Sequence, residues 1–150
     1  MDEITTELRR LGSVLSARLA GVATVGHERT EDTGVVEGAD IVPVADGAVR
    51  VWWMHSAEDI IVGLGDAPGW ELPRTAESVE VLRAIADAAA VGRVELGTGR
   101  GTTTYRVRTP DGVVREDTHE GPLGIVLSMP WKPRLVWATA APYRPSSTAE

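Results

Sequence analysis

The three histidines of this chain, His27, His55 and His119, are its best candidates for metal binding or acid–base chemistry. None has a second histidine within five residues, so the spacing typical of zinc sites is missing. Two of them stand beside a glutamate, but neighbouring residues on a strand point to opposite faces and do not clamp one ion. We therefore expect no metal and no cofactor. A site assembled in space from all three histidines is the alternative.

Motifs for nucleophilic catalysis and phosphate binding are also missing. The stretch from Gly97 to Gly101 is rich in glycine but matches neither the phosphate-loop nor the dinucleotide-binding pattern. A strand is expected to follow it, so no helix N-terminus would hold a phosphate, and a hairpin turn is favoured. No serine stands in a Gly-x-Ser-x-Gly context, and the chain has no cysteine, asparagine or glutamine. Acids are plentiful, so carboxylate catalysis stays open, but the sequence favours a protein that is not an enzyme.

Two adjacent tryptophans, Trp52 and Trp53, lie in an expected strand over residues 49–55. Side chains alternate along a strand, so the two rings point to opposite faces of the sheet. Trp53 shares its side with two valines, which assigns it to the core. Trp52 stands between Arg50 and Met54 on the other side and is the surface candidate. A sheet covered on both faces would bury both rings and is the alternative.

The other three tryptophans divide between core and loops. Trp137 lies in an apolar strand segment, and we assign it to the core. Trp70 and Trp131 stand close to prolines and glycine in expected loops or turns, where both rings would be partly exposed.

The segment from His27 to Asp46 carries six acids against a single arginine. A solvated loop and strand edge is the simple explanation; an electrostatic face that attracts a basic partner is the sharper one. Joined to the Trp52 side, this face predicts a protein-binding site formed by Trp52, Arg50, Met54, Glu31, Asp32, Glu37 and Asp40. An alternative ligand pocket would be lined by His55, Glu58, Asp59, Trp70 and Glu71.

Two helices follow from hydrophobic periodicity. Leucines recur at spacings of three and four over residues 2–21, which predicts an amphipathic helix with Asp2 as its N-cap. A second helix is expected over about residues 75–91, with Thr75 as its N-cap and a small alanine face for close packing on a sheet.

Short alternating segments predict strands near 22–28, 40–44, 49–55, 59–64, 93–96, 102–109, 113–118, 124–128 and 134–140. The clearest hairpin joins 102–109 to 113–118, with charge pairs expected from Arg106 and Arg108 to acids on the returning strand. The order of helix, strands, helix, strands predicts an α+β fold. In it, an N-terminal and a central helix pack on a mostly antiparallel sheet of short strands.

Length and charge limit the partners. The 150 residues suit one domain over 1–142, followed by a disordered tail over 143–150. A net charge of −7, with scattered basic residues, makes nucleic acid an unfavourable partner. No apolar run approaches the roughly 18 residues of a membrane span, and the acidic N-terminus does not resemble a signal peptide. We expect a cytoplasmic protein without membrane contact.

These properties favour a small acidic module that binds a protein partner, with a basic partner as the sharper expectation, and has no catalytic activity. Immunity proteins are often small, acidic, cysteine-poor α+β domains, and this class-level analogy suggests an inhibitor or immunity-type protein that neutralises its partner. A small enzyme or ligand-binding domain using the Trp- and acid-lined pocket is one alternative. Self-association through the Trp52 side is another.

Overall fold

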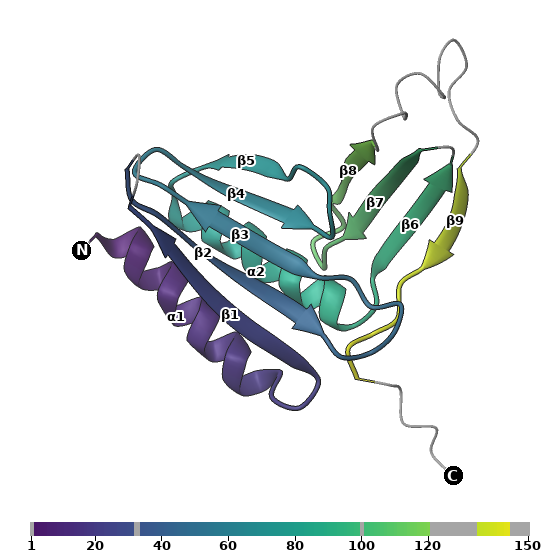
Figure 1. Ribbon diagram of the computed structural model, residues 1–150, viewed down its shortest axis with the longest axis horizontal. Coiled ribbons are helices and arrows are strands. Elements are labelled where there is room, and N and C mark those ends of the chain that lie inside the picture. Colours follow the sequence, from purple (N-terminus) through teal and green to yellow (C-terminus); the bar gives the residue numbers. More distant parts are fainter. Residues whose placement is uncertain (1, 32–33, 100, 121–134, 145–150) are drawn as a thin grey trace.

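The computed structural model describes residues 2–31, 34–99, 101–120 and 135–144 (Figure 1). The elements in chain order are α1 (Glu3–Arg18), β1 (Ala23–Thr30), β2 (Val36–Pro43), β3 (Val51–His55), β4 (Asp59–Leu64), β5 (Trp70–Pro73), α2 (Ala76–Ala90), β6 (Val94–Gly99), β7 (Thr102–Arg108), β8 (Val114–Glu120) and β9 (Val136–Thr139). The strands form a five-stranded sheet in the order β1-β2-β3-β4-β5 and a four-stranded sheet in the order β8-β7-β6-β9. The predicted α+β fold is confirmed, with two antiparallel sheets.

Helix α1 forms as its leucine periodicity predicts. The Asp2 carboxylate caps it by accepting the Thr5 backbone N–H at 2.8 Å. Leu8, Leu11 and Leu15 are buried along one stripe. Gly12 lies on the same buried side, where an added Cβ would come within 2.9 Å of His27 Cε1. Glycine weakens a helix by about 1 kcal/mol relative to alanine, and here it allows α1 to approach the sheet closely.

Helix α2 packs through its small and branched apolar residues. The Thr75 hydroxyl accepts the Ser78 backbone N–H at 3.2 Å, which confirms the expected N-cap. Leu82 and Ile85 are fully buried, and the alanines beside them are nearly so. Gly92 follows the helix with a φ of +79°, a left-handed conformation that favours glycine.

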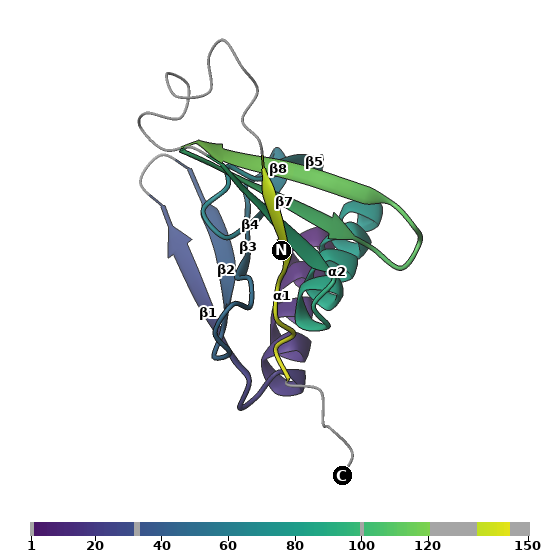
Figure 2. The ribbon, with the colours of Figure 1, turned by 90° about the vertical axis from the view of Figure 1, so that its right-hand side faces the viewer.

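The five-stranded sheet is an antiparallel meander with its core on one face. Val51, Trp53 and His55 alternate onto that face, and Trp53 is only 2% exposed. Figure 2 shows both helices on this side of the sheet. The sequence places Trp70 in a loop, but it begins β5 and lies opposite Val62 of β4. This short edge strand ends in a proline and is held by pairing with β4, which local propensity does not reveal.

The four-stranded sheet contains the predicted hairpin of β7 and β8. Arg106 donates to the Glu116 carboxylate at 2.7 Å, which confirms a cross-strand charge pair. Arg108 pairs instead with Glu95 on the neighbouring β6. Val94, on β6, faces the core. The strand expected over 124–128 and Trp131 lie outside the described residues.

Two expectations about the C-terminal region need correction. Trp137 is 36% exposed, because its ring lies on the outward face of β9 across from Gly97, under the Arg106 guanidinium. Tyr143, placed by the sequence in a disordered tail, is 2% exposed and donates its hydroxyl to the Val49 carbonyl at 2.5 Å. Arg144 also donates to the carbonyl that ends α1, so packed chain continues through residue 144. Among the described residues, neither helix is long and apolar enough to cross a membrane.

Candidate functional site

The first candidate surface is the face of the five-stranded sheet that points away from both helices. Cross-strand partners share a face of a sheet, and two rows of partners cover this one. One row runs Gly26, Asp40, Trp52 and Gly63, and the next runs Glu28, Gly38, Met54, Ile61 and Glu71. Trp52 thus lies on the outward face that alternation predicts, with the ring half-buried.

Gly63, which has no side chain, leaves the space in which the Trp52 ring packs. An added Cβ on Gly63 would lie 2.1 Å from Cζ2 of Trp52, so the indole occupies the space that any larger residue needs. The indole N–H donates to the Gly65 carbonyl at 3.0 Å. Arg50 donates to the same carbonyl and to the Asp40 carboxylate, each at 2.8 Å. The indole hydrogen bond holds the ring over Gly63.

Beside Trp52 the sheet surface is hollowed into a trough of about 320 Å³. Gly38 lies in its floor without a side chain, but an added Cβ there would come within 2.5 Å of the Trp53 carbonyl oxygen and 3.2 Å of Met54 Cγ, so Met54 covers part of the floor. In the adjoining row, nothing lies within 4 Å of an added Cβ on Gly26. Met54, 42% exposed, lies on one side and Glu28 on the other. We call this surface, with its two rows and the trough, the Trp52 face.

The acidic segment is divided between the two faces of the sheet. Asp40 lies on the Trp52 face, and its Oδ1 is buried without a hydrogen-bond partner among the described residues. Glu37 points to the helix side and pairs with Arg9 of α1 at 2.7 Å. Glu31 is exposed and pairs with Arg29, and Asp32 lies outside the described residues. The sequence groups these acids into one surface, but strand alternation separates them.

The residues of the alternative pocket do not converge. The Asp59 carboxylate accepts the Ser56 hydroxyl at 3.0 Å, and Glu58 beside it is exposed. Glu71 belongs to the Trp52 face. Trp70 donates its indole N–H to the Glu116 carbonyl at 3.0 Å, joining the two sheets. His55 is the remaining member, and it lines a different pocket.

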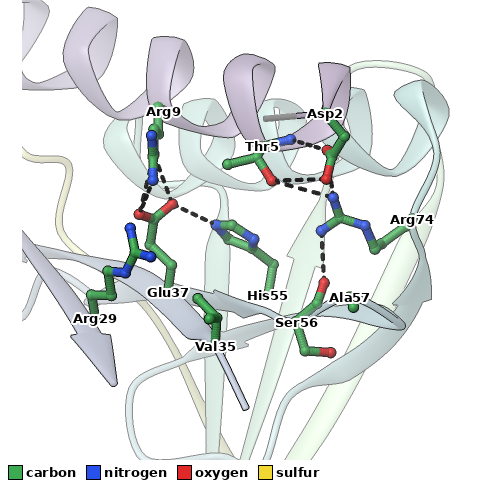
Figure 3. A pocket seen from close by; sticks show the side chains of 10 residues that line it. All are labelled: Asp2, Thr5, Arg9, Arg29, Val35, Glu37, His55, Ser56, Ala57 and Arg74. Atoms are coloured by element: carbon green, nitrogen blue, oxygen red, sulfur yellow. Dashed lines mark hydrogen bonds and ion pairs between the residues drawn. The ribbon is translucent and has the colours of Figure 1, made fainter. Parts of the chain in front are cut away.

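This second candidate site, the α1 pocket, lies between the start of α1 and the ends of β1, β2 and β3 (Figure 3). It has a volume of about 500 Å³. Its lining residues are Asp2, Thr5, Arg9, Arg29, Val35, Glu37, His55, Ser56, Ala57 and Arg74. Three arginines therefore face two carboxylates and one buried histidine. Arg74 is anchored by the Ser56 carbonyl at 2.7 Å and the Asp2 carboxylate at 2.6 Å.

The charge of the α1 pocket depends on the protonation states of two neighbouring residues, Glu37 and His55. Hydrogen bonds from Arg9 hold the pKa of Glu37 below its usual value, against the opposing effect of burial. Nε2 of His55 lies 3.2 Å from Oε2 of Glu37. Burial lowers the pKa of His55, and the attraction of Glu37 opposes this shift only in part. At neutral pH the site holds an ionised glutamate beside a neutral histidine.

The arginines of the α1 pocket are candidate site residues that sequence reasoning misses. Arg9, Arg29 and Arg74 come from a helix, a strand and the turn before α2, and no local motif joins them. No group of three or more histidine, aspartate or glutamate side chains in the described part of the chain is arranged to hold a metal ion.

No protein family, curated protein or solved structure matches this chain. Any functional conclusion therefore depends on the geometry of the two candidate sites.

Proposed function

We propose that this chain is a non-catalytic module that binds a partner protein on the Trp52 face, as an inhibitor or immunity-type protein. The trough is the observation that carries the proposal. Neither helix lies over it (Figure 2), and the described strands leave it open. Aromatic and methionine side chains that surround an open hollow are typical of binding hot spots.

The chemistry of the Trp52 face favours a basic segment that also carries an apolar side chain. Glu28, Asp40 and Glu71 share this face with one cation, Arg50, which is already paired with Asp40. Within the described part of the chain, no ion pair engages Glu28 or Glu71. The chain as a whole carries −7, which adds long-range attraction for a basic partner. The apolar side chain would lie in the trough beside Met54.

Capture experiments with matched tryptophan variants test this proposal. Trp52→Ala should weaken binding of the captured partner roughly thirtyfold, since a hot-spot tryptophan contributes about 2 kcal/mol or more. Trp137→Ala is the control, because Trp137 is also an outward tryptophan seated on a strand glycine. Met54→Arg is a second variant at an exposed position and should repel a basic partner. Denaturation curves confirm beforehand that each variant folds.

Equal retention of the partner by wild type and Trp52→Ala would contradict the proposal. A measurement of molecular size in solution could also contradict the proposal. If light scattering finds a dimer that Trp52→Ala converts to a monomer, the occupant of the Trp52 face is a second copy of this chain and not another protein.

A further inference from the structure

Strand β1 forms an open border of the five-stranded sheet, since β2 is its only neighbour among the described strands. Val44 donates its backbone N–H to the Val22 carbonyl at 2.9 Å, and hydrogen-bonded pairs alternate along an antiparallel ladder. The even-numbered residues of β1 therefore bond to β2, and the backbone groups of Val25, His27 and Arg29 point out of the sheet. No described backbone group pairs with these three residues. Figure 2 shows α1 in the helix layer and not beside this edge.

Three strand glycines of this protein are each contacted by the large side chain of their direct cross-strand partner. The pairs are Trp52 against Gly63, Met54 against Gly38 and Trp137 against Gly97. Gly26 of β1 has no such cover, because its partner on β2 is Asp40 and nothing lies within 4 Å of an added Cβ. Its other side is the open edge. A strand added to that edge would place a side chain directly across from Gly26, in the row of the Trp52 face that contains Trp52 itself.

Charge sets a second requirement for such a strand. Glu28 lies two residues after Gly26, so it points to the same face. It is exposed, and no ion pair within the described part of the chain engages it. A second copy of β1 is a poor occupant of the edge. Its sequence ATVGHERT contains no tryptophan or tyrosine to cover Gly26, and each chain carries a net charge of −7.

We propose that the partner protein adds an extended segment to the open edge of β1 as an antiparallel strand. An aromatic side chain of this segment lies over Gly26, and a lysine or arginine two residues earlier lies opposite Glu28. Its backbone bonds to the three open positions of β1, a mode in which main-chain hydrogen bonds give affinity and alternate side chains give specificity. The segment is thus recognised by the pattern basic-x-aromatic. This inference rests on the proposed function, because the added strand extends the Trp52 face.

The capped hexapeptide Thr-Lys-Val-Trp-Val-Thr is the probe for the full chain labelled with nitrogen-15. At millimolar concentration it should shift the amide resonances of Val25, His27 and Arg29 and slow their hydrogen exchange. The amides of Thr24 and Glu28 should keep their exchange rates, because they already bond to β2. A peptide with alanine in place of tryptophan should bind about tenfold more weakly, the effect expected for an aromatic anchor.

Matched variants separate the side-chain contact from the backbone contact. Gly26→Val fills the position reserved for the aromatic ring and should weaken peptide binding by a similar factor. Thr24→Val is its control, on the same exposed face of β1 in the next row. His27→Pro removes one open N–H, which an edge strand tolerates, and should weaken binding. His27→Ala keeps that N–H and should leave binding unchanged. Circular dichroism confirms that each variant folds.

The inference is wrong if the three open amides do not respond to the peptide, or if the tryptophan and alanine peptides bind equally. Equal effects of Gly26→Val and Thr24→Val would also overturn it. A dimer in which these amides are already protected would assign the edge to a second copy.

Hydrogen exchange in the complex with the captured partner distinguishes this inference from the proposed function. If Trp52→Ala loses the partner while the three amides stay unprotected in the wild-type complex, only the added strand is refuted. If Trp52→Ala retains the partner and the three amides are protected, the added strand is supported and the role of Trp52 is refuted.

Discussion

Substituting Gly63 with alanine tests the structural basis of the Trp52 face most directly. The new Cβ would fall 2.1 Å from Cζ2 and 2.3 Å from Cε2 of Trp52, so the ring must move. Overpacking of this kind costs about 1–3 kcal/mol. Loss of the indole hydrogen bond to Gly65 adds about 1 kcal/mol. Alanine also makes the unfolded chain less flexible than glycine does, which stabilises the folded state by about 0.4–1 kcal/mol. We therefore expect Gly63→Ala to lower the free energy of unfolding by about 1–3 kcal/mol.

Gly26 supplies the matched control for this substitution. It lies on the same face in the same row of partners, but nothing lies within 4 Å of its added Cβ. Gly26→Ala should therefore raise the free energy of unfolding slightly, by about 0.4–1 kcal/mol. Urea denaturation followed by circular dichroism measures both variants under one set of conditions. The two alanines should change stability in opposite directions.

A double-mutant cycle shows whether Trp52 is the cause. In a Trp52→Ala background the ring is gone, so Gly63→Ala should lose its penalty and behave like Gly26→Ala. If Gly63→Ala costs the same with and without the tryptophan, the indole does not require this glycine. If Gly63→Ala and Gly26→Ala are equally stable, the packing described for this face is wrong.

Two further predictions concern the core and the buried histidine. Leu82→Ala, at a fully buried position of α2, should lower the free energy of unfolding in urea by about 2–5 kcal/mol. Val91→Ala, at a 61% exposed position, is the control and should change it by less than about 0.5 kcal/mol. Equal effects of the two substitutions would contradict the packing of α2. Because burial lowers the pKa of His55 below its ordinary 6.5, the unfolded chain takes up this proton at higher pH than the folded chain. The free energy of unfolding should therefore fall as pH drops from above 6.5 toward the folded pKa, and His55→Gln should flatten that part of the curve. An unchanged slope in the variant would show that His55 is not buried as described.

The elements were predictable where one local signal sufficed. Leucine periodicity and the caps Asp2 and Thr75 locate both helices. Turn residues and alternation locate most strands. The division into two sheets was not predictable, because it depends on pairing between distant segments such as β6 and β9. The misassignment of Trp137 has the same origin: an apolar strand sequence does not tell which of its faces meets the core.

The candidate sites were predictable only in part. Alternation along β3 correctly separates Trp52 from Trp53, because that rule operates within one strand. The acidic segment was misjudged because the expected strand began at residue 40, whereas β2 begins at Val36. Alternation along β2 sends Glu37 toward the helices and Asp40 away from them. The α1 pocket unites residues that are as far apart as 2 and 74, so it exists only after tertiary folding.

The surroundings of the two outward tryptophans explain why the Trp52 face is the better docking surface. Trp137 is the more exposed, but Arg106 covers its ring at 3.9 Å and pairs in turn with Glu95 and Glu116. A partner that docked there would have to remove water from several charges, and buried ion pairs return little of that cost. Trp52 adjoins the trough and the exposed Met54, where docking displaces water from apolar surface. Removing Trp137 should therefore leave partner binding intact while removing Trp52 abolishes most of it.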